Sequence, residues 1–150
     1  MGDENSMNQN EKEIMKHLRQ GKKLNISAIA RELSLPISTV ADKLKRIEEK
    51  YVTKRSSLLD YKSLGYTAHH IVAIKASPHQ KSEVLDFLKQ QKCVNSVYHT
   101  NSSFSFLIEV VCRDSFQFIN WVEQLKSKFS VELQPFQILK VEERERFMPE

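Results

Sequence analysis

Apolar residues in the first third of the chain recur at the helical period, and they predict three consecutive helices. The first is expected over about 8–20, with Gly21 as its stop, the second over about 27–33, and the third over about 36–50. The stripes that define these helices are Ile14, Met15 and Leu18, then Ile26, Ile29, Ala30 and Leu33, then Ile37, Val40, Leu44 and Ile47.

The second and third stripes are separated by Ser34-Leu35-Pro36. Proline disfavours helix at the residue before it and is accepted in the first turn of the next helix. A short helix, a tight turn and a longer helix form the helix-turn-helix arrangement. In it, Ala30 lies where a larger side chain would separate the helices, and Val40 fills the angle between them. Ser34 takes a turn position at which glycine is more common.

The third predicted helix has small polar residues at the start of its outer face. Hydroxyl side chains there let a helix N-terminus approach base edges and phosphates in a major groove, and the helix dipole favours phosphate. A plain three-helix packing unit is the alternative. The residues predicted to read bases are Ser38, Thr39, Asp42 and Arg46, and those predicted to contact phosphate are Lys22, Lys23, Lys43, Lys45, Lys54 and Arg55.

The segment after these helices predicts a domain boundary. YVTKRSSLLD (51–60) suggests a short extended pair or wing, and DYKSLG (60–65) a turn and linker. The expected organisation is a disordered tail over 1–7, a winged helix-turn-helix domain over 8–55, a short strand and linker over 56–66, and a second domain over 67–150.

The rest of the chain alternates strand-like and helix-like patterns in the order β-α-β-β-α-β. Strands are expected over 67–76, 94–100, 104–112 and 131–141, and helices over 77–91 and after Asp114. The strand over 104–112 is expected to be central, and Pro135 suggests an edge position or bulge for the last strand. The residues of the second helix expected to face the core are Phe118, Ile119, Val122, Leu125 and Phe129.

This order predicts an α+β fold, in which a winged helix-turn-helix precedes a ferredoxin-like βαββαβ domain. Such a domain carries both helices on one face of a four-stranded antiparallel sheet. The other face needs cover, and a second copy packed sheet to sheet would supply it. We therefore predict at least a dimer formed through the second domain.

Basic residues are concentrated in the first part of the chain. Residues 11–65 hold 13 lysines and arginines against 7 acidic residues, whereas residues 66–150 hold 10 of each. This distribution suggests that only the first part meets a polyanion, although an ordinary solvated lysine surface gives the same count. No run of about 18 apolar residues and no secretory signal pattern is visible, so we expect no membrane span and a cytoplasmic protein.

Motifs for cofactor or metal chemistry are missing from the sequence. With three glycines, neither GxGxxG nor GxxxxGK[ST] can be written, and no HExxH, GxSxG or Cys/His cluster occurs. Cys93 and Cys112 are far apart in sequence, which favours buried thiols in a reducing compartment. We expect no enzyme, cofactor or metal site.

Four segments taken in order resemble the Lrp/AsnC (leucine-responsive/asparagine regulator, feast/famine) family of transcription factors. They are MNQNEKEIMKHL, IARELSLPISTVADKLKRIEEKYV, LLDYKSLGY and FQILKVEER, and the resemblance extends from about Met7 to Phe147. It implies double-stranded promoter DNA as a partner, contacted through the third helix. It also implies a dimer that assembles into tetramers or octamers, often tuned by an amino acid at the interface between dimers.

One departure from that family concerns the effector. Family members usually carry a Gly-Asp-Tyr-Asp type turn before the third strand, where this chain has Ser102-Ser103-Phe104-Ser105. Hydroxyls and an amide can still hold a small polar ligand, but an ammonium group loses its counter-charge. Altered ligand preference, no effector, and a plain hairpin loop all stay open. The candidate effector-binding residues are Tyr98, Thr100, Asn101, Ser102, Ser103, Phe104 and Ser105.

Two further functions are weighed against DNA binding. Sirohaem decarboxylases share this two-domain architecture and use histidine and basic residues around a tetrapyrrole, but no arginine lies beside His99 here, and the nearest C-terminal one is Arg113. His69 and His70 are consecutive on a predicted strand, so they point to opposite faces. An oligomerising or RNA-binding adaptor is the third alternative.

Overall fold

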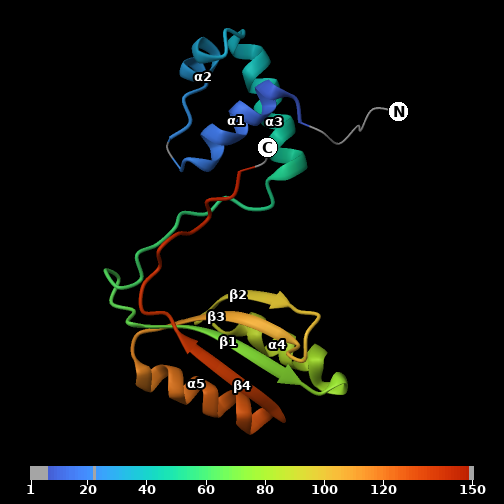
Figure 1. Cartoon of the computed structure of the whole chain (residues 1–150), viewed down its shortest axis with the longest axis vertical. Helices are drawn as coiled ribbons and strands as arrows, with labels where there is room; N and C mark the ends of the chain where they lie inside the picture. Colours follow the sequence, from blue (N-terminus) through green and yellow to red (C-terminus); the bar gives the residue numbers. More distant parts are fainter. Residues whose placement is uncertain (1–6, 22, 149–150) are drawn as a thin grey trace. The chain divides into compact units, whose positions relative to one another are not determined.

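The computed structural model describes residues 7–21 and 23–148, and Figure 1 shows its helices and strands. The chain divides into two compact units, Met1–Leu58 with Glu143–Glu150, and Leu59–Glu142. The last residues of the chain, expected in the second domain, therefore cluster with the first unit. Residues 1–6 of the expected disordered tail lie outside the described residues, whereas Met7 packs against the helical core.

The first unit contains the three predicted helices, α1 (Gln9–Arg19), α2 (Ile26–Glu32) and α3 (Ile37–Tyr51), each within one residue of its expected bounds. Asn8 and Glu11 form a capping box at the start of α1, and the Asn25 side chain caps α2 by accepting from the Ala28 N–H at 3.0 Å. The core comprises Ile14, Met15, Ile29, Ala30, Val40, Leu44 and Ile47, which are the residues of the predicted stripes that are most buried.

The turn between α2 and α3 closes in a Schellman motif. The Leu35 N–H donates to the Ala30 carbonyl at 2.9 Å and the Ser34 N–H to the Arg31 carbonyl at 3.3 Å. Ser34 has a φ of 54°, a left-handed conformation that favours glycine. The predicted helix-turn-helix is therefore confirmed, with serine in the position where glycine is more common.

The wing expected over 51–60 is absent from the structure: Tyr51 ends α3, and residues 52–60 form no strand. A hairpin formed by these nine residues alone would be an isolated two-stranded ribbon, which is at best marginally stable, and a single extended segment needs a partner strand. The turn expected over 60–65 is confirmed. There the Asp60 carboxylate accepts from the Ser63 N–H and hydroxyl, and Gly65 takes a φ of 85°.

The second unit is a four-stranded sheet with the order β2-β3-β1-β4 and antiparallel pairing throughout. Its elements confirm the βαββαβ prediction and the central place of the third strand. They are β1 (Ala68–Ala76), the short helix η1 (Pro78–Gln80), α4 (Lys81–Gln90), β2 (Val94–His99), β3 (Phe106–Cys112), α5 (Ser115–Lys128) and β4 (Val131–Gln137).

β1 and β2 are each one residue shorter than expected, and β3 and β4 are shorter by two residues or more, each for a local reason. β3 starts at Phe106 because Thr100 to Ser105 close a turn, in which the Thr100 N–H donates to the Ser105 carbonyl. β4 ends at Gln137, which pairs with His70 close to the start of β1, so little of β1 is left to pair with residues 139–141. Pro135 lies in β4, an edge strand, as its missing N–H requires.

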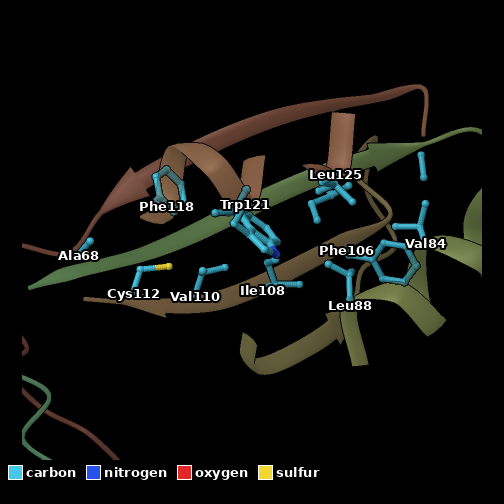
Figure 2. Packing of buried hydrophobic residues seen from close by; sticks show 13 residues of the cluster. Ala68, Val84, Leu88, Phe106, Ile108, Val110, Cys112, Phe118, Trp121 and Leu125 are labelled. Carbon is cyan, nitrogen blue, oxygen red and sulfur yellow. The ribbon is translucent and has the colours of Figure 1, made fainter. Parts of the chain in front are cut away.

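Both helices pack on the same face of the sheet. Figure 2 shows alternate side chains of β3, among them Phe106, Ile108 and Val110, packed with Val84 and Leu88 of α4 and with residues of α5. The buried residues of α5 are Phe118, Trp121 and Leu125. The expectation that Ile119 faces the core is wrong, because it is 51% exposed. Successive residues of a helix are rotated by about 100° around its axis, so Ile119 lies at the margin of the buried stripe that contains Phe118.

Candidate nucleic-acid interface and effector loop

The predicted base-reading residues all lie on the side of α3 that faces away from the core. Ser38, Asp42 and Arg46 are exposed and Thr39 is partly exposed, whereas Val40, Leu44 and Ile47 are buried on the opposite side. Pro36 is the N-cap, and no side chain among the described residues caps the helix. The first N–H groups of α3 therefore stay available to an anion at the end that carries the hydroxyls.

The predicted phosphate contacts differ in how freely they can move. Lys45 is 77% exposed and Lys23 and Lys54 are also exposed. The Lys43 side chain is only 21% exposed, with its Nζ 4.0 Å from the Glu11 carboxylate on α1. Arg55 forms an ion pair with Glu48. Lys22, the sixth predicted contact, lies outside the described residues.

The Glu11 carboxylate explains the position of Lys43. Glu11 is 9% exposed, and its Oε2 accepts from the Asn8 N–H at 3.0 Å in the capping box. A buried carboxylate is unfavourable without hydrogen bonds or a counter-charge, and the Asn8 N–H and Lys43 supply both. The Lys43 ammonium group is therefore drawn toward α1, which reduces its reach to a bound phosphate.

The loop between β2 and β3 contains most of the candidate effector residues, and several of their hydroxyls are already used. Thr100 Oγ1 donates to the Phe104 carbonyl at 2.5 Å, and Ser102 Oγ accepts from the Phe104 N–H at 3.2 Å. Ser105 is buried, and its hydroxyl bonds to both the N–H and the carbonyl of Ala76. Asn101 and Ser103 are exposed, so they are the loop side chains best placed to meet a ligand.

Tyr98, the remaining candidate, lies outside this loop network. It is 59% exposed and belongs to β2, where it pairs in register with Leu107 of β3. Leu107 alternates with the core residues Phe106 and Ile108, so Tyr98 and Leu107 lie on the face of the sheet opposite the helices. The structure thus joins Thr100, Ser102 and Phe104 through side-chain hydrogen bonds, whereas the Ser105 hydroxyl bonds to β1 and Tyr98 lies on β2.

A polar cluster on that helix-free face was missed by the sequence interpretation. The Glu109 carboxylate of β3 contacts His69 Nε2 at 2.7 Å, Asn95 Nδ2 at 2.6 Å and Ser96 Oγ at 3.3 Å. The Tyr61 ring packs edge-on against His69, with ring centroids 5.2 Å apart. The only sequence signal is a single carboxylate inside the apolar run FLIEVVC.

His69 and His70 point to opposite faces of the sheet, as predicted. The His70 ring stacks on Phe118 of α5 at a centroid distance of 3.8 Å, and its Nδ1 is buried without a hydrogen-bond partner among the described residues. Burial, followed by the proximity of His69, lowers the pKa of His70. The described residues contain no cluster of three or more His, Cys, Asp or Glu side chains that could hold a metal.

The two cysteines, 19 positions apart in sequence, interact in the folded chain. Cys93 precedes β2, where its carbonyl accepts from the Val111 N–H at 2.8 Å, and the thiols of Cys93 and Cys112 hydrogen-bond to each other. Burial, with a smaller contribution from Cys93, raises the pKa of Cys112 to about 12, and burial also raises the pKa of Cys93. Neither thiol is activated for nucleophilic chemistry, which agrees with a structural role.

Comparison with known proteins gives both sequence relatives and structural neighbours. No family model matches the chain. The HTH-type transcriptional regulator FL11 of Pyrococcus horikoshii is 24% identical over 123 residues, covering 81% of this chain and 82% of the relative. The structure of E. coli AsnC superposes with a TM-score of 0.86 at 16% identity, covering 96% of this chain and 99% of AsnC. The chain has the fold of the Lrp/AsnC family.

This finding confirms the Lrp/AsnC resemblance and the α+β fold expected from the sequence. Another structure with the Lrp/AsnC fold is a transcriptional regulator from Neisseria meningitidis in complex with L-methionine, with a TM-score of 0.85 and 17% identity over 96% of this chain and 97% of that one. Within the described residues, no helix is both long and apolar enough to cross a membrane.

Proposed function

We propose that this protein is a sequence-specific DNA-binding transcription regulator that reads operator bases with α3. The observation that carries the proposal is the polar face of α3, with Ser38, Thr39, Asp42 and Arg46 turned away from a complete helix-turn-helix core. The fold shared with AsnC and the similarity to FL11 support it. Lys23, Lys45 and Lys54 anchor phosphates. Lys43 contributes less because its ammonium group lies near the buried Glu11, and Arg55 contributes less because it is paired with Glu48, whereas Lys45 and its neighbour Glu49 are both highly exposed.

The test is a comparison of operator DNA with random duplex for the double variant Thr39→Ala/Arg46→Ala. Each good side chain to base contact is worth about 1–3 kcal/mol of discrimination, so preference for the operator should fall roughly ten- to a hundredfold or more. Genomic footprinting of the unaltered protein would first identify the operator. Lys89→Ala, an exposed cation on α4, is the matched control and should leave that preference unchanged.

We also propose that the chain self-associates through the helix-free face of its sheet. Alternation along the strands places Ile71, Ala73, Leu107 and Phe136 on that face, where Leu107 of β3 pairs with Ala73 of β1, and Ile71 of β1 pairs with Phe136 of β4. Tyr98 and Phe136 remain 59% and 49% exposed there. A second copy covers these rings through a two-fold, self-complementary contact, and sedimentation over a concentration series tests it. A tetramer or octamer would be a further step from this dimer.

The loop over 100–105 is the place where we propose that a small polar effector binds. Its exposed Asn101 and Ser103 offer amide and hydroxyl groups, and the loop contains no carboxylate to pair with an ammonium group. The Neisseria meningitidis neighbour holds L-methionine, which supports a small ligand in this fold. Calorimetry with amino acids and their deaminated acids should favour ligands without the ammonium group, and Asn101→Ala should abolish that binding. No heat with either series would leave the segment a plain hairpin loop.

The enzyme and adaptor alternatives have no observation of their own in their favour. His99 packs edge-on against Phe106 with a centroid distance of 4.7 Å, which gives it a structural contact. The relative FL11 named above is an HTH-type transcriptional regulator. Haem-like absorbance in the purified protein would revive the decarboxylase alternative, and a preference for RNA over duplex DNA would revive the adaptor.

A further inference from the structure

Arg19, at the end of α1, binds the C-terminal segment of the chain. Its Nη2 donates to the Glu145 carbonyl at 2.6 Å and its Nε to the Phe147 carbonyl at 3.1 Å. Its Nη1 also lies 3.4 Å from the Glu145 carboxylate. We propose that Arg19 binds the segment over 143–148, and that this contact gives the first unit, which contains α1, α2 and α3, a second tether to the rest of the chain.

The geometry of the contact suits arginine specifically. A guanidinium presents several donors in a rigid plane, so it can bind two carbonyl groups and a carboxylate together, whereas a lysine ammonium acts as a compact point charge. Glu145 has a φ of 54°, so the segment bends where Arg19 binds it. The two partners are more than 120 positions apart in sequence, yet both belong to the first compact unit.

The path of the chain explains why the contact between Arg19 and the C-terminal segment would restrain the first unit. The chain leaves the first unit after Leu58 and returns to it at Glu143. Residues 52–60, which make the outgoing connection, form no helix or strand, so this connection alone restrains the first unit weakly. When Arg19 binds the returning segment, the chain forms a closed loop. This loop reduces the conformational freedom of the first unit before it binds DNA.

A restrained reading unit matters when two copies bind two half-sites together. Restriction that precedes binding lowers the entropy lost on binding, which raises the effective concentration of the second reader at its half-site. A single half-site does not require this alignment. This inference rests on the proposed function, because it supposes DNA binding by a dimer.

The experiment compares Arg19→Gln with unaltered full-length protein. Hydrogen exchange of the amides over 143–148 reports the contact, and affinities for a duplex with two half-sites and for one with a single half-site report the tether. Arg19→Gln should accelerate exchange and weaken paired-site binding roughly three- to tenfold, since only loop-closure entropy is involved. Single-site affinity should stay unchanged.

Two control variants separate the contact from charge and folding. Lys16→Gln removes a cation from the same last turn of α1, where Lys16 pairs with Glu13 within the helix, and it should change neither readout. Arg19→Lys keeps the charge but loses the planar donors, so it should behave like Arg19→Gln. Amides of α1 and α3 should exchange as before in every variant.

The outcomes are separable. Unchanged exchange over 143–148 in Arg19→Gln would overturn the contact, and faster exchange with unchanged paired-site affinity would overturn the tether. If the unaltered protein bound no duplex at all, the proposed function would fail. The exchange measurement would still decide whether Arg19 holds the segment.

Discussion

At the scale of single residues, Ser34 carries the most strained backbone of the helix-turn-helix. A left-handed conformation is unfavourable by roughly 1–2 kcal/mol for a residue with a Cβ, and Ser34 has a φ of 54°. Ser34→Gly should therefore stabilise the first unit by about 0.5–1 kcal/mol, after the greater freedom of glycine in the unfolded chain is counted. Native-state hydrogen exchange of α2 and α3 measures this, because the single tryptophan lies in the other unit.

A second serine provides the control for this prediction. Ser27 lies inside α2 with helical backbone. Ser27→Gly should destabilise the same helices by a few tenths to 1 kcal/mol, because glycine is a poor helix former. If both substitutions destabilised α2 to the same extent, the strain assigned to Ser34 would be wrong.

The lowered pKa of His70 should make the stability of the second unit depend on pH. Burial lowers the pKa of His70 in the folded chain, so between this pKa and about 6.5 the unfolded chain binds more protons. The free energy of unfolding should therefore fall as the pH drops below about 6.5, and the loss should continue until the folded-state pKa is passed. Trp121 lies in the same core, so its fluorescence in denaturant titrations from pH 7.5 to about 5 measures this.

His70→Phe keeps an aromatic ring against Phe118 and removes the titrating group. The variant should lose much of the dependence on pH in this range. His79, which is exposed on η1, is the matched control, and His79→Phe should keep the slope of the unaltered protein. An identical slope in His70→Phe would show that other groups govern the acid response.

At the scale of elements, the two faces of α5 predict opposite responses. Trp121 is 4% exposed between α5 and the sheet, so Trp121→Ala should destabilise the second unit by about 3–5 kcal/mol. Ile119 is half exposed, so Ile119→Ser should change the free energy of unfolding by about 0.5 kcal/mol or less. Thermal unfolding followed by circular dichroism checks both. A large loss from Ile119→Ser would restore the inward orientation that periodicity predicted.

Two lysines of α3 differ in burial, and this difference predicts unequal contributions to DNA binding. Lys45 is far more exposed than Lys43, whose ammonium group lies near the buried Glu11. Lys45→Gln should weaken binding to all duplexes and reduce the slope of affinity against salt by about 1, whereas Lys43→Gln should change that slope less. Fluorescence anisotropy at several salt concentrations measures both. Equal slopes for the two variants would mean that Lys43 leaves Glu11 when DNA binds.

Elements were predictable from the sequence where local chemistry decides them. Asn8 with Glu11, Asn25, and Ser34 before Pro36 set the bounds of three helices, and Asp114 caps α5 as expected. The errors occur where partners distant in sequence decide. Residues 52–60 form no strand because no partner strand pairs with them, and the end of β4 depends on where β1 begins. Periodicity alone could not choose between Ile119 and Trp121, since both lie near the apolar side of α5.

Some features of the candidate site could likewise be predicted from the sequence, and others could not. The outward positions of Ser38, Asp42 and Arg46 follow from helical periodicity, so they could be predicted. The pairing of Lys43 with Glu11 could not, because it joins two helices whose packing the sequence does not specify in atomic detail. The same holds for the contact between the two cysteines and for the binding of the C-terminal segment by Arg19, which both depend on how distant segments come together.

At the scale of the whole molecule, the helix-free face of the sheet combines apolar residues with a shielded charge. Ser96, Glu109, Ile71 and Phe136 are successive partners in register across the four strands. The Glu109 side chain is only 10% exposed in the single chain and has hydrogen-bonding partners on β1 and β2. A second copy can therefore cover this face without supplying new partners for the carboxylate.

His69→Leu tests whether this network supports the dimer. The substitution removes a partner of Glu109 at a site that the second copy is proposed to cover, and the loss of one hydrogen bond to a buried charge is worth about 1–3 kcal/mol. Water can replace the lost partner in the separated chains but is excluded from a two-fold interface, which contains the site twice, so dimer dissociation should become easier by roughly ten- to a hundredfold or more. Analytical ultracentrifugation measures the dissociation constant, and circular dichroism of dilute protein shows whether the monomer still folds.

Lys75→Leu is the control, because Lys75 lies on the same strand and face but is half exposed and paired with Glu132 near the sheet edge. An exposed pair of this kind contributes about 1 kcal/mol or less, so the dissociation constant should change little. Equal weakening by both variants would show that any loss of polarity on this face disturbs the dimer. Unchanged association in His69→Leu would place Glu109 outside the interface, and the two copies would then have to meet through another surface.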